Sequence, residues 1–167
     1  NVFPFLSQYN VEPDELHILY LGAIPLMLGS TFWLLCYRCM VGSPDDNIAN
    51  IWADISDNYT MHRVKTQFSS LGLSSFTNHE RPRSDYPMLK GKGAEIKDVV
   101  FPILLAWEKF GTYEFEVVRD MLRHQCDMIN ILSSNAGDVF LPEEDAESFC
   151  TLNDCVLDCY TKLARKG

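Results

Sequence analysis

The chain has 167 residues, of which 47% are apolar and 22% are charged, so its composition is globular and excludes a disordered chain. The length suits one domain. The chain starts at Asn1 rather than Met and shows no signal-peptide pattern, so we expect a single helical domain (1–167) or a fragment of a larger polypeptide. The net charge of −9 disfavours a domain that binds nucleic acid through its whole surface.

Residues 18–36 form the first predicted element, a run of nineteen residues without a charge that is punctuated by Pro25 and two glycines. Two structures fit this run. One is a short strand or turn near 16–21 followed by a helix to about residue 41, and the other is one kinked helix. Either way, the first helix is predicted to be long and very apolar.

A second helix is predicted to start at Ser43, which can cap it, with Pro44 in its first position and two aspartates in its first turn. Its buried stripe is predicted from apolar residues at steps of three and four, namely Ile48, Ile51, Trp52 and Ile55. The helix should end near Tyr59. A long, irregular and basic connection then follows, at about 60–93.

Three more helices are predicted, over about 94–111, 113–133 and 142–166, and Pro102 should kink the first of them. The fold class is therefore mainly α, with about five helices. Their apolar stripes predict one common core. Its expected members include Val100, Leu104, Trp107, Phe115, Leu122 and Leu157.

Charge is concentrated in residues 60–97, which hold seven basic and three acidic side chains and so carry +4, leaving −13 for the remainder. Such a segment is either a solvated loop or a surface that follows a nucleic-acid backbone. In the second case the predicted contacts are Arg81, Arg83, Lys90 and Lys92. Because the surrounding charge repels a polyanion, we expect this binding to be weak or absent.

The six cysteines include one Cys-x-x-Cys pair, Cys36 and Cys39, and a C-terminal group at helical intervals. A zinc site usually needs two such pairs at suitable spacing, and the C-terminal group does not supply the second. The cysteines are therefore interpreted as structural thiols, with metal or redox use as the alternative, and no metal site is predicted.

Two segments carry a family resemblance. The first comprises DELHILYLG (14–22) and LGSTFWLLCY (28–37), and the second is YPMLKGKGAEIKDVVFPILLAWEKF (86–110). Together they resemble transposon-derived proteins that are abundant in some unicellular algae. They are more remotely similar to CACTA-type transposases, which have a histidine-containing acidic segment before an apolar helix and a lysine-rich loop that enters a later helix.

The resemblance implies an RNase H-like enzyme with three carboxylates that hold Mg²⁺ and a nuclear location. By this match Asp14 corresponds to the second catalytic aspartate, and Glu95, with Asp98 as the alternative, corresponds to the later acidic residue. The first aspartate would lie upstream of this chain. We therefore expect a transposase-like fragment that is catalytically incomplete alone, and Mg²⁺ only if an ancestral carboxylate site persists.

The alternative is a single-span accessory subunit of a large assembly such as a photosynthetic or respiratory complex, in a thylakoid or inner mitochondrial membrane. A run of about 20 apolar residues can cross a bilayer, and residues 18–36 approach that length. The predicted span includes Ile18, Leu26, Phe32 and Trp33. The expected partners are other protein subunits, and a helical adaptor remains a third interpretation.

Overall fold

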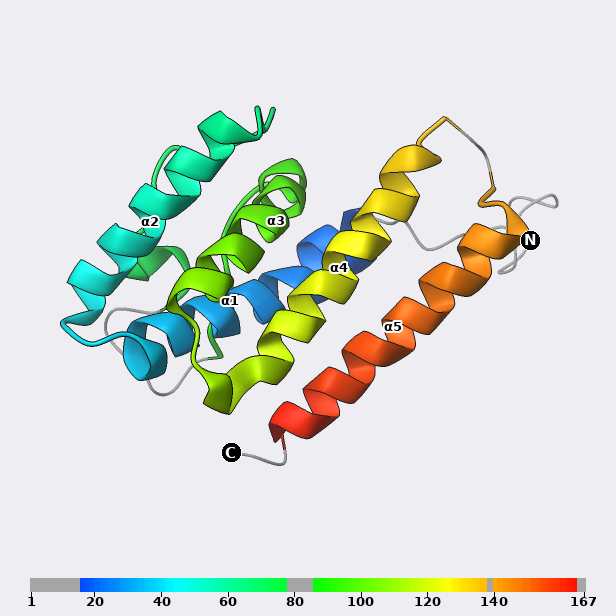
Figure 1. The fold of residues 1–167 in the computed structure, drawn as a ribbon. Helices are drawn as coiled ribbons and strands as arrows, with labels where there is room; N and C mark the ends of the chain where they lie inside the picture. Colours follow the sequence, from blue (N-terminus) through cyan, green and yellow to red (C-terminus); the bar gives the residue numbers. More distant parts are fainter. Residues whose placement is uncertain (1–15, 78–85, 138–139, 165–167) are drawn as a thin grey trace, which may run out of the picture.

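The computed structural model describes residues 16–77, 86–137 and 140–164 (Figure 1). Within these ranges the fold contains five α-helices and no strand, which confirms the predicted mainly α class. The helices are α1 (Ile24–Leu34), α2 (Pro44–Met61), α3 (Gly93–Phe110), α4 (Glu116–Ser134) and α5 (Glu143–Ala164).

The first apolar run is one continuous helix. α1 is preceded by a π-helical stretch, η2 (Leu16–Ala23), and followed by a second one, η3 (Leu35–Cys39). The interpretation as one helix is therefore confirmed, and the strand considered near 16–21 is wrong. Pro25 stands in the first turn of α1, where a missing N–H is tolerated. The buried Thr31 hydroxyl donates to the Met27 carbonyl at 2.9 Å.

α2 starts as the sequence predicts. The Ser43 hydroxyl accepts a hydrogen bond from the Asp46 N–H at 3.1 Å, and Pro44 is the first helical residue. The buried Asn47 adds a contact that the sequence pattern did not reveal, because its amide donates to the Cys36 carbonyl at 2.9 Å. This bond satisfies a carbonyl at the end of the first helix and holds α2 against it.

The C-terminus of α2 closes through a left-handed residue. Arg63 has φ 53°, and the next N–H, that of Val64, donates to the Tyr59 carbonyl at 3.0 Å. Glycine is the usual residue in this position, because a Cβ is strained at positive φ. The sequence pattern predicts that α2 ends near Tyr59, whereas its last residue is Met61, two residues later.

The connection between α2 and α3 is irregular in its described parts, apart from one 3₁₀ turn, η4 (Leu73–Ser75). After residue 86 it crosses α1 at Gly29. The Leu89 N–H donates to the Pro25 carbonyl at 2.9 Å, and a Cβ on Gly29 would lie 2.5 Å from the Met88 nitrogen. Only a glycine allows the two backbones to approach so closely.

α3 is the central helix of the fold and runs without interruption through Pro102 (Figure 1). It contacts the first helix, α2 and α4. Its inward face is completely apolar and includes Ile96, Val100 and Trp107. An ion pair between Lys109 and Asp54 of α2 joins the two helices at their surface.

α4 lies between α3 and α5, and α5 makes its main contacts with α4 alone (Figure 1). The predicted core is confirmed for Val100, Leu104, Trp107 and Leu122, whereas Phe115 is half-buried. Leu157 was predicted wrongly, since 55% of its surface is exposed. A helix with one neighbour buries only a narrow stripe, which α5 supplies through Val156 and Cys159.

Replacing Gly29 by alanine should lower the free energy of unfolding by about 1–3 kcal/mol, because the new methyl group would overlap the backbone of Met88. Urea unfolding measures this change. Gly72→Ala is the matched control, since Gly72 has extended backbone and no atom within 4 Å of its added Cβ. Equal destabilisation by the two variants would contradict the backbone crossing.

Replacing Arg63 by glycine should raise the free energy of unfolding by about 0.5–1 kcal/mol, because glycine removes the strain of a side chain at positive φ. Arg63→Ala is the control, as it deletes the same charged group but retains a Cβ. If thermal or urea unfolding shows the same change for both variants, the charge rather than the backbone conformation is responsible.

Candidate functional site

The predicted catalytic residues are only partly within the described residues. Asp14 lies outside them, so its distance from Glu95 stays a prediction. Glu95 is at the N-terminus of α3, where its carboxylate accepts the Lys92 N–H at 2.8 Å. Asp98 lies one turn further on and accepts the Thr66 N–H at 3.1 Å. Both carboxylates therefore have structural bonds to backbone donors, the first as a helix cap and the second as an anchor for the connection.

Only two of the four predicted nucleic-acid contacts lie within the described residues. Arg81 and Arg83 lie outside the described residues. Lys90 and Lys92 are exposed on the segment that leads into α3, and the Lys90 amine donates to the Ser74 carbonyl at 3.3 Å. The prediction of one basic face formed by all four residues therefore stays untested.

The predicted membrane span has two different sides. Leu19–Cys39 is long and apolar enough to cross a membrane, yet 56% of its most apolar window is buried within the fold. Phe32 is completely buried and stacks on Phe76 with ring centroids 5.4 Å apart. Leu26 is 44% exposed and Trp33 is half-buried, while the Ile18 side chain lies outside the described residues.

From Leu19 to Tyr37 the solvent-accessible side of this helix carries no charge, and the exposed Arg38 follows directly. One strip of it, which we call the outer face, comprises the exposed Ala23, Leu26 and Ser30 and the half-buried Leu19, Trp33 and Tyr37, while the exposed Leu21 lies beside this strip. The Trp33 and Tyr37 rings stack with their centroids 5.3 Å apart at its C-terminal end. Such a continuous apolar strip is a candidate contact surface, since exposed apolar areas of this kind commonly mark interaction sites.

All six cysteines are described and are free thiols. Among the described residues no cluster of three or more histidine, cysteine or acidic side chains could hold a metal ion. Burial raises the pKa of the Cys36 and Cys126 thiols to about 12. These two thiols are therefore protonated at neutral pH, as expected for structural cysteines.

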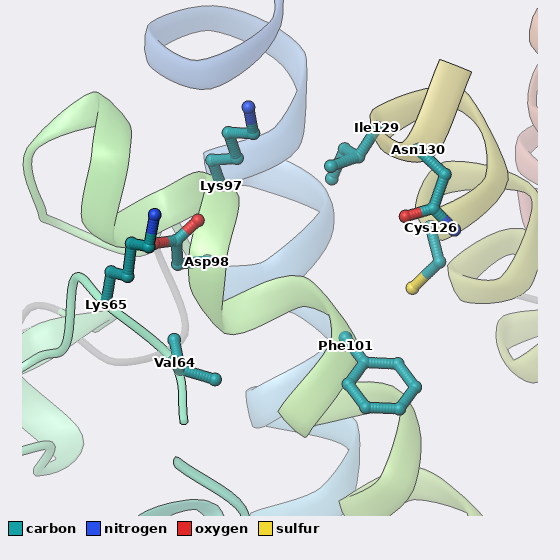
Figure 2. Close-up of a pocket in the computed structure, with 8 residues that line it drawn as sticks. All are labelled: Val64, Lys65, Lys97, Asp98, Phe101, Cys126, Ile129 and Asn130. Carbon is teal, nitrogen blue, oxygen red and sulfur yellow. The ribbon is translucent and has the colours of Figure 1, made fainter. Parts of the chain in front are cut away.

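Figure 2 shows a pocket of about 290 Å³ between the connection, α3 and α4. The connection contributes Val64 and Lys65, and α3 contributes Lys97, Asp98 and Phe101. The pocket joins two cationic side chains to an apolar wall, and we call it the amphipathic pocket.

The α4 wall of this pocket consists of Cys126, Ile129 and Asn130. Cys126 and Ile129 are only half-buried, although the apolar stripe of α4 predicts that they face the core. The two lysines belong to the basic segment recognised in the sequence, whereas no sequence signal singles out Phe101. The pocket could not be predicted from the sequence, because its walls come from segments that are far apart in the chain.

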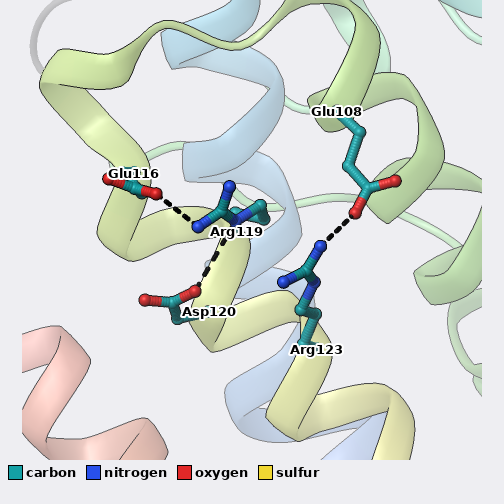
Figure 3. A network of polar contacts seen from close by, with 5 residues as sticks. All are labelled: Glu108, Glu116, Arg119, Asp120 and Arg123. Carbon is teal, nitrogen blue, oxygen red and sulfur yellow. Dashed lines mark hydrogen bonds and ion pairs between the residues drawn. The ribbon is translucent and has the colours of Figure 1, made fainter.

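A second hollow of about 390 Å³ lies between the end of α3 and the start of α4 and contains paired charges (Figure 3). Arg123 donates to Glu108 at 2.6 Å, and Arg119 is ion-paired with Glu116. The Arg119 Nε also lies 3.6 Å from an Asp120 carboxylate oxygen. The Arg119 pairs lie within α4, whereas the Arg123–Glu108 pair joins α4 to α3.

The exposed Cys150 should react rapidly with a chromogenic disulfide reagent at mildly alkaline pH, whereas Cys36 and Cys126 react slowly. Their slow reaction follows from the burial of Cys36, the partial burial of Cys126 and a pKa of about 12 for both thiols, since the thiolate is the nucleophile. Stopped-flow absorbance measures the phases. Cys150→Ser should remove the fastest phase and Cys126→Ser should leave it; the reverse pattern would contradict the assigned burial.

Comparison with known protein families, with curated proteins and with solved structures finds no match to this chain. The resemblance to transposon-derived proteins, which depends on the segments at 14–37 and 86–110, therefore stays a prediction.

Proposed function

We propose that the chain is a protein-binding subunit of a larger assembly, and that its contact surface is the outer face of the first helix. The proposed occupant is an apolar helix of a partner protein. The observation that carries the proposal is a continuous uncharged strip on a protein whose net charge is −9. Exposed apolar residues that form one continuous strip, rather than single scattered ones, often mark a surface that a partner covers.

The spacing of the outer face suits a helical partner. Its residues, from Leu19 to Tyr37, follow one another at alternating intervals of four and three. This is the interval of a seam along which two helices pack side by side. At a rise of about 1.5 Å per residue, the seam is roughly 25 Å long.

The side chains along the seam also suit close packing. Ala23 and Ser30 are small and exposed, so a second helix can approach near these positions. Trp33 and Tyr37 form a stacked pair at one end of the strip, and both are half-buried. Tryptophan and tyrosine are the residue types that most often dominate the energy of protein interfaces.

The opposite side of the helix supports a protein partner over a bilayer span. Phe32 stacks on Phe76 of the connection, α3 packs on α1, and α2 packs on η3, so lipid would reach only part of the helix surface. A span in this folded state would take α2 into the bilayer with the helix, together with the aspartates Asp45 and Asp46 of its first turn. Burying such carboxylates in hydrocarbon is strongly unfavourable.

An origin from a transposase-like protein is compatible with this role. Glu95, which the resemblance assigns to catalysis, serves here as a helix cap through its bond to the Lys92 N–H. Asp98, the alternative catalytic residue, also has a structural role, because its carboxylate accepts the Thr66 N–H and so anchors the connection. We therefore propose that the chain contributes to an assembly through α1 rather than through these carboxylates.

Replacing Leu26 by glutamate should release the chain from its assembly, because a charge is placed in the middle of the apolar seam. We expect the assembly-bound fraction in extracts of the source cells to fall roughly tenfold or more. Native size fractionation of the tagged chain measures this fraction. A photoreactive amino acid at position 26 should in addition crosslink the chain to another protein.

Leu157→Glu is the matched control, since Leu157 is exposed on α5 to a similar degree and the charge change is identical. It should leave the assembly-bound fraction unchanged, and both variants should retain the helical circular dichroism of the wild type. Three results would overturn the proposal: equal release by both variants, a purified chain that dimerises through position 26, or crosslinking of position 26 to lipid alone.

A further inference from the structure

We infer that the amphipathic pocket binds a small amphipathic anion, with one carboxylate or phosphate group on a short apolar body. The site is separate from the outer face of the first helix and does not depend on the function proposed for it. Its two halves match the two halves of such a ligand. The lysine amines would receive the anionic head, and the apolar wall would receive the body.

The cationic half consists of Lys65 from the connection and Lys97 from α3 (Figure 2). Among the described residues, neither amine has a carboxylate oxygen within ion-pair distance, whereas Lys109 and Lys162 are both paired. The Lys97 amine lies over the Tyr20 ring, 5.9 Å from its centroid. Both lysines line the pocket, and without a carboxylate partner each amine is available to an external anion.

Asp98 is the opposing charge in this pocket, so the charge of the lining is +1 rather than +2. One oxygen of its carboxylate accepts the Thr66 N–H at 3.1 Å. This bond holds the connection, and with it Lys65, against α3. Asp98 therefore positions one of the two cations while it weakens the attraction for an anion, and the two effects are separable by substitution.

The apolar half is formed by Phe101, Ile129 and Val64 (Figure 2). Phe101 is 41% exposed, and its ring makes an edge contact with His62 at a centroid distance of 5.1 Å. The neighbouring Cys126 thiol remains uncharged at neutral pH, because burial raises its pKa to about 12. An alkyl or aryl body next to these side chains leaves water and gains roughly 0.8 kcal/mol per buried methylene.

The size of the pocket limits the ligand. Its volume of about 290 Å³ lies at the lower end of the range for small-molecule sites. A chain of about eight carbons with one head group suits this space, so octanoate and octyl phosphate are the probes. Octan-1-ol and octylammonium have the same body with a neutral and a cationic head, and they serve as matched ligands.

Titration of the full chain with each probe, followed by backbone amide chemical shifts in NMR, tests the inference. Octanoate or octyl phosphate should shift the amides of Lys65, Lys97 and Phe101, and the tighter of the two identifies the head group. Octan-1-ol should bind more weakly, and octylammonium should not bind. Added salt should weaken the binding of both anions.

Substitutions then separate the roles of the lining residues. Lys65→Gln and Lys97→Gln should each weaken binding of the anionic probe roughly five- to tenfold, as expected for loss of a charge-assisted hydrogen bond. Lys92→Gln removes the same charge from an exposed position outside the pocket and should have little effect. Asp98→Asn keeps an acceptor for the Thr66 N–H but removes the opposing charge, so it should tighten binding.

The inference is wrong if neither anionic probe shifts these amides at millimolar concentration, or if octylammonium binds as well as octanoate. It is also wrong if Lys92→Gln weakens binding as much as the two pocket substitutions, because attraction to the general surface would then explain the result. Thermal unfolding of each variant verifies that the fold is retained. Phe101→Ser, which removes the apolar wall and keeps both lysines, supplies an independent measure and should weaken both anionic probes.

Discussion

The close approach of two backbones at Gly29 is the constraint from which the arrangement of the other elements follows. The segment after residue 86 crosses the first helix at this point and donates the Leu89 N–H to the Pro25 carbonyl. Four residues later the chain enters α3 at Gly93, so the crossing determines where α3 starts relative to the apolar helix. α2 and α4 then pack on α3, and α5 packs on α4.

This arrangement brings into contact segments that are distant along the chain. The amphipathic pocket is bounded by the connection just after α2, by the second and third turns of α3 and by the middle of α4. Because α3 borders both the core and the pocket, a change in its position would alter both. The outer face of the first helix is different, since all of its residues belong to one continuous helix.

The sequence was a good guide wherever a local signal decided the structure. Ser43 and Pro44 marked the start of α2, because capping and proline placement act within one turn. The sequence was a poor guide to how many neighbours a helix has. Leu157 fits the apolar stripe of α5 as well as Val156 does, and it is exposed because α5 has one main neighbour. The Asn47 bond to the Cys36 carbonyl and the placement of Lys65 and Lys97 around one pocket depend on tertiary packing, which the pattern of a single sequence does not contain.

The attachment of α5 through one neighbour has a consequence for the order in which the fold opens. Helices that pack on several others can leave only when the core is disrupted, whereas α5 can detach while α1, α2 and α3 stay assembled. Local opening of this kind has a lower free energy than global unfolding and lets amide hydrogens exchange with solvent. α5 is therefore a separable cooperative unit, and the surface of α4 that it covers becomes transiently available to another chain whenever it opens.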